Sequence, residues 1–330
     1  MGMMDLDNVE RPTRLRVGGA NTERAAHFRK RFPPAAKRRT YHRETILWPL
    51  RDSPVNPERT EITDPMSSTK EIKDLAIEMG ADAVGIAEFD PRLVFSQVDQ
   101  VDHKFVIVYA MNMAYDFMAD IGPRSQDEVH QVYYKLDDLG VRLAHTIGSY
   151  GYAARMHPNA GDFPLPALGQ LAGLGELGKH GSLISPELGS SFRLGAVSTD
   201  MKLVADGPKD YGIDEVCANC NICAKFCPGD AIKHDKKTVK GVTRWYVDTP
   251  ACEPYFHKLY GCKICLMVCP YNGRGVLKEQ FKPTARDIRD AKDANGLLAL
   301  IESRTDLNYD DFNYAEGDTE TAIKPDEEIS

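Results

Sequence analysis

The chain has 330 residues, of which 42% are hydrophobic and 27% charged, a composition typical of soluble globular proteins. No apolar run approaches the roughly 20 residues that a membrane-spanning helix needs, and the net charge of −8 argues against nucleic acid as the main partner. Residues 1–60 carry 13 Lys and Arg against 7 Asp and Glu, whereas residues 300–330 carry 2 against 10. Such ends are usually solvated, and the alternative is that they contact each other or dock a redox partner.

Residues 1–65 are predicted to form a basic, proline-rich arm with little sustained helix, because seven prolines interrupt the segment. Arg38-Arg39 is compatible with a twin-arginine export signal, but the polar residues 40–44 follow instead of an apolar stretch. We therefore predict a cytoplasmic protein, with a trimmed leader as the alternative.

The next segment alternates helix and strand. Ser68-Thr69-Lys70-Glu71 has the spacing of a capping box and predicts a helix that ends at Gly80. Strands are predicted over residues 83–87, 104–109, 152–156 and 192–198, the second of them buried on both faces. A long helix over residues 125–147 carries an apolar stripe: Val129, Val132, Tyr133, Leu136, Leu139, Leu143 and Ile147. This order predicts an α/β or α+β core over residues 66–205.

All eight cysteines fall between Cys217 and Cys269, which predicts a cluster-binding module over residues 206–280 and leaves residues 281–330 as an acidic extension. The first run is Cys217-x2-Cys220-x2-Cys223-x3-Cys227-Pro228, the pattern of a bacterial ferredoxin, in which the fourth cysteine binds the other cluster. A disulfide scaffold would be smaller and secreted, and structural zinc favours separate C-x2-C pairs.

The second run, Cys262-x2-Cys265-x3-Cys269-Pro270, lacks its first cysteine, because Leu259 occupies that position. Cys252 is the remaining thiol, and nine residues separate it from Cys262. The spacing therefore predicts two [4Fe–4S] clusters, with Cys252 reached across a stretched loop. Their ligand sets are Cys217, Cys220, Cys223 and Cys269 for the first cluster, and Cys227, Cys252, Cys262 and Cys265 for the second. One cluster with leftover cysteines is the alternative.

Residues 173–178 read Gly-Leu-Gly-Glu-Leu-Gly, which matches the G-x-G-x-x-G of dinucleotide-binding folds. That motif requires a strand before it and a helix after it. Here residues 166–172, which precede the motif, favour a helix where a strand is required. Lys179-His180-Gly181-Ser182, which follows the motif and is itself followed by Pro186, does not favour the required helix. We interpret the glycines as a place where the backbone approaches something closely, without a nicotinamide cofactor.

The stretch from Ala172 to Gly189, followed by Arg193-Leu194-Gly195, resembles the core motif of cobalamin-dependent reductive dehalogenases. The two cysteine runs, including the detached Cys252, are similar to that family and to its cousin, epoxyqueuosine reductase. The resemblance covers roughly residues 66–275. It implies a nitroreductase-like core that binds a base-off corrinoid, fed by two [4Fe–4S] clusters, and the net reaction R–X + 2e⁻ + H⁺ → R–H + X⁻.

The resemblance also implies site residues. The motif would contact the corrinoid through Gly175, Lys179, His180, Leu183 and Ser185. The Tyr–Asn–Arg set of the respiratory dehalogenases would be Tyr133, Asn159 and Arg193, in which the guanidinium stabilises the tyrosinate left after proton transfer. Tyr134 is the alternative donor, and a core tyrosine and a strand arginine are the structural alternatives. If a lysine such as Lys179 accompanies the tyrosine, the role of Asn159 is different.

Epoxyqueuosine reductases carry an aspartate where this chain has Asn159, and that departure disfavours a tRNA-modifying enzyme. The preferred hypothesis is a catabolic dehalogenase acting on a small organohalide. Its electrons would come from an external ferredoxin or an NAD(P)H-dependent reductase, because the sequence has no flavin or further ferredoxin module. The alternatives are tRNA modification and a corrinoid-handling or electron-transfer protein that does not dehalogenate.

Overall fold

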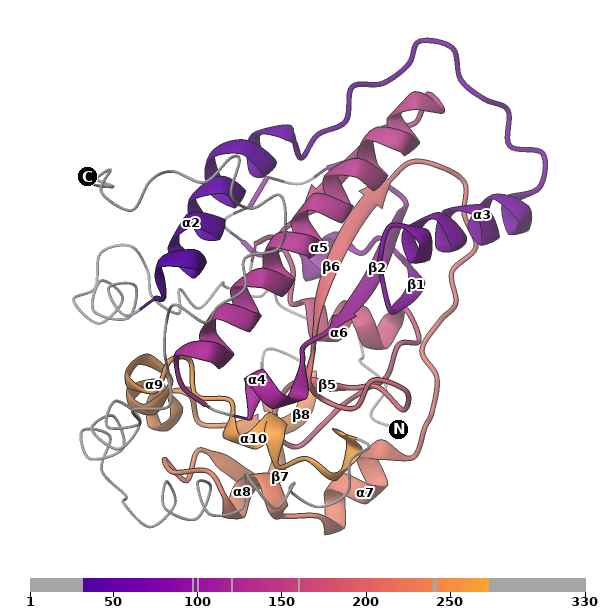
Figure 1. Cartoon of the computed structure of the whole chain (residues 1–330). Helices are drawn as coiled ribbons and strands as arrows, with labels where there is room; N and C mark the ends of the chain where they lie inside the picture. Colours follow the sequence, from indigo (N-terminus) through magenta and orange to yellow (C-terminus); the bar gives the residue numbers. More distant parts are fainter. Residues whose placement is uncertain are drawn as a thin grey trace.

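The computed structural model describes residues 32–96, 98–99, 101–119, 121–159, 161–239 and 242–272. Its centre is a four-stranded sheet with the order β1-β2-β6-β3, formed by β1 (Ala83–Glu88), β2 (Phe105–Asn112), β3 (Ala154–His157) and β6 (Phe192–Thr199) (Figure 1). Every neighbouring pair is antiparallel. The core is therefore an α+β sheet, and the α/β description holds only in the broad sense of mixed helix and strand.

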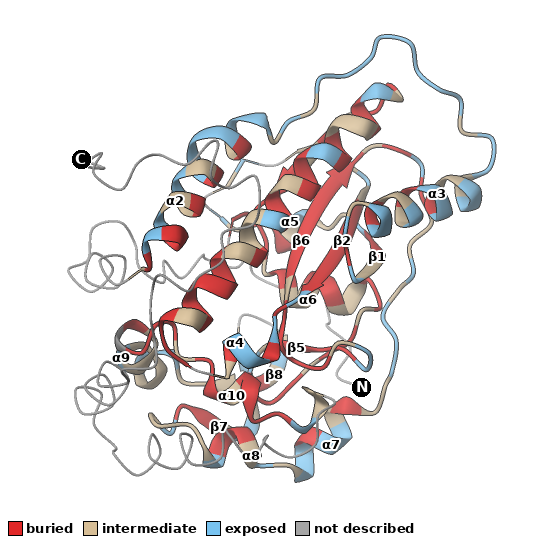
Figure 2. Ribbon diagram, viewed as in Figure 1, coloured by how far each residue is buried: buried red, intermediate tan, exposed pale blue. Residues whose placement is uncertain are grey.

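Helices cover both faces of this sheet. Helix α5 (Pro123–Ser149) packs along one face, and the short helix α6 (Leu165–Leu171) packs on the other. Strand β2 separates two apolar clusters, because Ile107 and Tyr109 point toward α5 whereas Val106 and Val108 point toward α6. Figure 2 shows the resulting buried centre, which confirms the prediction that this strand is buried on both faces.

Helix α3 (Pro65–Glu78) begins earlier than predicted. Its N-cap is Asp64, whose side chain accepts the N–H of Met66, and Pro65 occupies the first helical position. Ser68 therefore lies inside the helix, and the predicted capping box is wrong. The helix ends as expected near Gly80, which has a φ of 106°.

The N-terminal segment contains more helix than predicted. Helix α2 (Pro34–His42) continues into a π-helical turn, η2 (Arg43–Leu47), and a 3-10 turn, η3 (Trp48–Leu50). Figure 1 shows α2 lying against α5. Prolines 33 and 34 precede or begin the helix, where a missing N–H costs nothing, so they do not interrupt it. Residues 51–64 then run over the core, where the N–H of Asn56 bonds to the carbonyl of Gly148.

The cysteine-bearing residues form a module at one end of the sheet (Figure 1). It contains helices α7 (Ile213–Asn219), α8 (Ile222–Lys225), α9 (Thr249–Lys258) and α10 (Ile264–Met267), the hairpin β7 (Ile232–Val239) and β8 (Val242–Val247), and the turn η5 (Pro270–Asn272). The remaining elements are η4 (Pro91–Leu93), α4 (Tyr115–Met118) and a small hairpin, β4 (Glu176–Leu177) and β5 (Leu183–Ile184). No described helix has the length and apolar character needed to cross a bilayer.

The stretch between Cys252 and Cys262 is mostly helical, which corrects the prediction of a stretched loop. Cys252 lies in α9, which begins after the N-cap Asp248 and continues to Lys258. Tyr260 and Gly261 then turn the chain with φ values of 52° and 77°. The extra residues therefore form a short helix that carries Cys252. The expected basic arm before residue 32 and the acidic extension over residues 281–330 lie outside the described residues.

Candidate functional site

Four cysteines of the first predicted set surround one cavity. Its lining combines Cys217, Cys220, Cys223 and Cys269 with Lys179, His180, Ile184, Val216, Pro270 and Tyr271. The core contributes groups beside these thiols: burial raises the pKa of Cys217 and of Cys269, and the backbone N–H of Lys179 and the Ser190 hydroxyl lower these two pKa values in turn. Burial, together with the neighbouring thiols, raises the pKa of Cys223 to about 12. Bound iron would supply the positive charge that such buried thiolates need.

The second predicted set also lies together. Burial raises the pKa of Cys262 to about 12, and the nearby Cys252 and Cys227 act in the same direction. Burial also raises the pKa of Cys265, which is influenced by the same three thiols and by Cys223 of the first set. Among the described residues, no three His, Cys, Asp or Glu side chains are grouped as for a single metal ion. This donor set fits thiolate-bound clusters, and Cys265 and Cys223 place the two sets next to each other.

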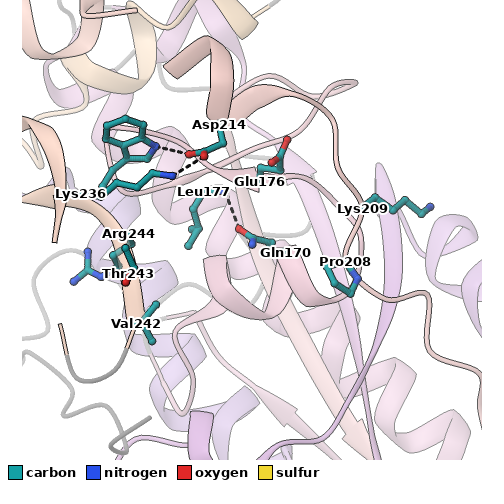
Figure 3. A pocket seen from close by; sticks show the side chains of 11 residues that line it. Gln170, Glu176, Leu177, Pro208, Lys209, Asp214, Lys236, Val242, Thr243 and Arg244 are labelled. Atoms are coloured by element: carbon teal, nitrogen blue, oxygen red, sulfur yellow. Dashed lines mark hydrogen bonds and ion pairs between the residues drawn. The ribbon is translucent and has the colours of Figure 1, made fainter. Parts of the chain in front are cut away.

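The glycine-rich motif does not have the order of a dinucleotide site, since helix α6 precedes it and the β4–β5 hairpin follows. Gly175 packs against protein backbone, because a Cβ at this position would lie 2.0 Å from the carbonyl oxygen of Ile184. Gln170 Oε1 accepts the N–H of Leu177 at 3.0 Å and ties the hairpin to α6 (Figure 3). The close approach expected at the glycines is therefore internal packing of this hairpin.

The other residues of the predicted corrinoid motif either pack in the core or lie at one of two cavities. Leu183 is buried in the core beside α6. Lys179 and His180 face the first cysteine cavity, where Lys179 Nζ donates to Asn221 Oδ1 at 2.8 Å. Ser185 Oγ accepts N–H groups of the next turn, and residues 186–188 of that turn line a second cavity of about 360 Å³. This second cavity also contacts residues 112–115 and Tyr271, so it lies between the core and the cysteine module.

The three predicted catalytic residues come together around β6. The Arg193 guanidinium lies 5.6 Å from the centre of the Tyr133 ring. Asn159 Nδ2 donates to the carbonyl oxygen of Leu194, the residue after Arg193, at 3.2 Å. Arg193 Nε is buried and has no hydrogen-bond partner among the described residues. A buried donor without a partner is costly, so this atom favours a site that a ligand completes.

Sequence reasoning missed a second arginine beside Tyr133. Arg43, from the turn after α2, places its guanidinium 5.0 Å from the ring centre of Tyr133 and bonds to Asp137 Oδ2 at 2.7 Å. Burial raises the pKa of Asp137, and Arg43 with the indole of Trp48 offsets part of that effect. One feature of the sequence could have indicated this arginine. Asp137 lies beside the apolar stripe of its helix, and a buried carboxylate needs a cationic partner. The partner lies in a segment that we expected to be an arm.

Two hydrogen bonds and a ring contact connect Lys263 of the cysteine module to Tyr133. Lys263, next to Cys262, donates to Gln126 Oε1 at 3.4 Å, and the Gln126 amide contacts His130 Nε2 at 2.8 Å. His130 Nδ1 contacts the Thr40 hydroxyl at 3.0 Å, and its ring meets the Tyr133 ring edge to face at 5.8 Å. Lys263 is thus linked to Tyr133 through Gln126 and His130, whereas Lys179 lies at the first cysteine cavity.

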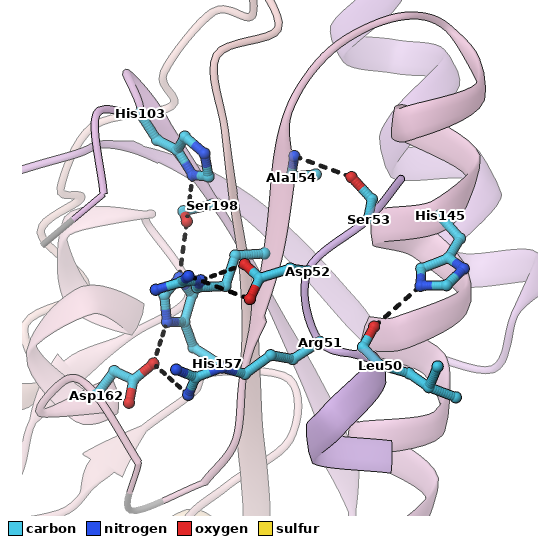
Figure 4. A network of polar contacts seen from close by, with 11 residues as sticks. Leu50, Arg51, Asp52, Ser53, His103, His145, Ala154, His157, Asp162 and Ser198 are labelled. Carbon is cyan, nitrogen blue, oxygen red and sulfur yellow. Dashed lines mark hydrogen bonds and ion pairs between the residues drawn. The ribbon is translucent and has the colours of Figure 1, made fainter. Parts of the chain in front are cut away.

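The turn that carries Asn159 is fixed by a buried network (Figure 4). His157 contacts Asp162 Oδ2 through Nδ1 at 2.6 Å and Ser198 Oγ through Nε2 at 2.7 Å. Burial alone would raise the pKa of Asp162, but the bond from His157 and the nearby Arg51 lower it overall. The order Asp–His–Ser resembles a nucleophilic triad, yet Ser198 is 0% exposed. The network therefore supports the turn and does not present a nucleophile.

The pKa of His130 predicts a pH-dependent stability. Burial lowers this pKa well below 6.5, and the surrounding cations, led by Arg43, act in the same direction. Below the unfolded value the unfolded chain binds a proton that the folded chain does not, so stability should fall as pH decreases from about 6.5. The expected loss is up to ~1.4 kcal/mol per pH unit for this residue.

Denaturant unfolding followed by circular dichroism between about pH 7.5 and 5.5 checks this expectation. His130→Asn should show a shallower decline than the parent, whereas His145→Asn, at a histidine that contacts the Leu50 carbonyl, should keep the parental slope. Equal slopes in both variants would contradict the assignment.

Comparisons with known proteins agree with the resemblance. Residues 216–276 match the family described as 4Fe-4S dicluster domain. A tetrachloroethene reductive dehalogenase of Sulfurospirillum multivorans is 29% identical over 277 residues, covering 69% of this chain and 54% of that protein. One of Desulfitobacterium hafniense is 28% identical, covering 58% of this chain and 37% of that protein. An epoxyqueuosine reductase of Lactococcus garvieae is 33% identical, covering 55% and 51%.

Solved structures share the fold. The catabolic reductive dehalogenase NpRdhA in complex with 3-bromo-4-hydroxybenzoic acid has a TM-score of 0.72 at 24% identity, covering 90% of this chain and 46% of that chain. A reductive dehalogenase structure described as suggesting a mechanism for B12-dependent dehalogenation has a TM-score of 0.72 at 25% identity. Homologues of this chain are thus reductive dehalogenases, which are iron–sulfur oxidoreductases, and the predicted resemblance is confirmed. The chain spans about half or less of the length of these relatives.

Proposed function

We propose that this protein catalyses reductive dehalogenation of a small organohalide in the cytoplasm, with the net reaction R–X + 2e⁻ + H⁺ → R–H + X⁻. The observation that carries the proposal is the meeting of Tyr133 and Arg193 at β6, beside a module with two sets of four cysteines. The cofactors would be two [4Fe–4S] clusters and a base-off cobalamin in a nitroreductase-like core. The electrons would come from an external ferredoxin or an NAD(P)H-dependent reductase.

When bound, cobalamin would supply the low-valent cobalt that delivers electrons to the carbon–halogen bond. The cavity of about 360 Å³ between the core and the cysteine module, whose wall includes the turn capped by Ser185, would hold part of this cofactor. The Nε of Arg193, which has no hydrogen-bond partner in the part of the chain that the structure describes, also fits a site completed by a ligand. Lys179 and His180 would serve the first cluster, since both line its cavity.

The chain's own residues would handle the proton. Tyr133 would hold it at the phenol oxygen and donate it to the substrate carbon. The guanidiniums of Arg193 and Arg43, at 5.6 and 5.0 Å from the ring centre, would stabilise the negative charge that remains on the phenolate. Asn159, held next to Arg193 by its bond to Leu194, would orient the substrate or the phenol.

Anaerobic reconstitution with iron, sulfide and cobalamin tests this proposal. We expect about eight irons and one cobalt per chain, and halide release from at least one member of a panel of aryl and alkenyl halides. Four irons, or no bound cobalt, would contradict the cofactor assignment. Cobalamin reduction without halide release from any substrate would instead favour a corrinoid-handling protein.

A tRNA-modifying activity is the second candidate, because the epoxyqueuosine reductase of Lactococcus garvieae is 33% identical. Those enzymes resemble this chain in the cysteine runs but carry an aspartate at the position of Asn159. An amide cannot donate the acidic proton that a carboxylic acid can. Binding of tRNA without halide release would favour this candidate over dehalogenation.

A further inference from the structure

The β7–β8 hairpin concentrates positive charge in an acidic chain. Residues 232–247 contain five Lys or Arg against one Asp, although the whole chain has a net charge of −8. Lys237 is exposed, while Lys236 and Arg244 are half-buried along the hairpin. A local field of this sign attracts acidic molecules and accelerates their association.

A pocket lies between this hairpin and the core (Figure 3). It is lined by the cations Lys209, Lys236 and Arg244 and by the carboxylates Glu176 and Asp214. Both carboxylates are already engaged: Glu176 Oε2 accepts the N–H groups of residues 211 and 213, and Asp214 accepts the Trp245 indole N–H and bonds to Lys236. The acidic groups of the pocket are therefore committed to the fold.

Two of the three cations that line the pocket are not engaged in this way. Lys209 and Arg244 have no carboxylate partner among the described residues, and Figure 3 shows their side chains pointing outward on opposite sides of the pocket. Together with Lys236, which pairs with Asp214, and the exposed Lys237, they form a group of cations that we call the hairpin patch: Lys209, Lys236, Lys237 and Arg244.

The hairpin patch lies next to the first cysteine cavity. The Trp245 ring has the Lys236 ammonium 5.0 Å from its centre and the Lys179 ammonium 4.7 Å from it. Lys179 lines the cavity of the first cysteine set together with Cys217. Trp245 of the pocket lining and Lys179 of the cavity lining are thus in contact, so the pocket and the cavity are neighbours. Val216, in the wall of the same cavity, is 46% exposed.

We propose that the hairpin patch docks an acidic one-electron carrier protein, which reduces the cluster held by Cys217, Cys220, Cys223 and Cys269. The inference rests on the proposed clusters. In each encounter the carrier loses one electron and the cluster gains one. No proton is transferred, and no covalent bond forms or breaks. A carrier protein fits better than a nicotinamide, because a cluster accepts single electrons whereas a nicotinamide delivers a hydride. The adjoining cluster cavity favours a redox partner over tRNA.

Stopped-flow reduction of the reconstituted protein by a reduced acidic ferredoxin tests the proposal. The double variant Lys209→Glu/Arg244→Glu should slow cluster reduction at least ~10-fold at low salt, and the difference should shrink as salt screens the charges. The matched control is Lys70→Glu/Lys104→Glu, which reverses two exposed charges outside the hairpin patch. Dithionite, a small reductant, should reduce all three proteins at the same rate.

Four results would contradict the proposal. Wild-type rates in the Lys209→Glu/Arg244→Glu protein, or an equal loss in the control, would overturn it. If that variant loses binding to a tRNA but keeps its rate with ferredoxin, the hairpin patch belongs to nucleic acid. Fewer than about eight irons in every preparation, including the parent, would contradict the proposed clusters, and the docking proposal, which rests on them, would fall with them.

Discussion

Tyr133→Phe should reduce halide release by at least ~100-fold while leaving the iron and cobalt contents unchanged. The substitution removes only the phenol oxygen, which is the proposed source of the transferred proton. The ring would remain between the guanidiniums of Arg43 and Arg193, at 5.0 and 5.6 Å from its centre. The packing around the site should therefore survive, and the lost rate would report on the proton.

Tyr134→Phe is the matched control for this prediction. Tyr134 is the next residue on α5 and contacts the ring of His42 instead, with centroids 5.3 Å apart. We expect near-parental halide release from this variant. A full rate in Tyr133→Phe would show that the proton comes from elsewhere, and a collapse in Tyr134→Phe alone would move the role to that residue. Single-turnover measurements, which separate proton transfer from electron delivery, give the clearest comparison.

Cys252→Ala should lower the iron content from about eight to about four per chain and abolish halide release. Cys252 is the thiol that completes the second set, and its pKa is raised by burial and by the neighbouring Cys227. Without it, three thiols would remain for that cluster, while the first set would keep all four ligands. Iron analysis with low-temperature magnetic resonance of the reduced protein would identify the cluster that remains.

Cys220→Ala is the matched variant for the other set, because Cys220 lines the first cavity. It should also leave about four irons, with a different resonance from the cluster that survives in Cys252→Ala. Eight irons in Cys252→Ala would mean that another group replaces this thiol. Loss of all iron in both variants, with the fold retained, would mean that the two clusters assemble only together.

Much of the fold was predictable because its elements have strong local patterns. The stripe on α5 and the continuous apolar run of β2 predicted both elements to within a few residues. The capping box at Ser68 failed because Asp64 and Pro65 provide a better helix start one turn earlier. Helix α2 was missed because the prolines were counted as breakers, although Pro33 and Pro34 stand at its beginning.

The candidate site was predictable only where cysteine spacing or a resemblance supplied a motif. Cysteine spacing gave two ligand sets, and the structure places their members near one another. Tyr133 and Arg193 were expected together and do lie together. Arg43, His130 and Lys263 were not expected, because Arg43 and Tyr133 are 90 positions apart and Lys263 and His130 are more than 100 positions apart. Spacing along the sequence carries no information on contacts of that range.

The contacts of helix α2 mean that a functional fragment of this chain has to include this helix. Its Arg39 bonds to Asp127 at 2.6 Å, Thr40 contacts His130, and Arg43 in the following turn faces Tyr133. A shortened protein starting at residue 66 would keep the sheet and all eight cysteines. It would also leave Asp127 and Asp137 buried without the arginines that bond to them. Chimeras between relatives should therefore exchange α2 and the turn after it together with α5. Ion pairs join these segments, because Arg39 and Arg43 bond to Asp127 and Asp137 of α5.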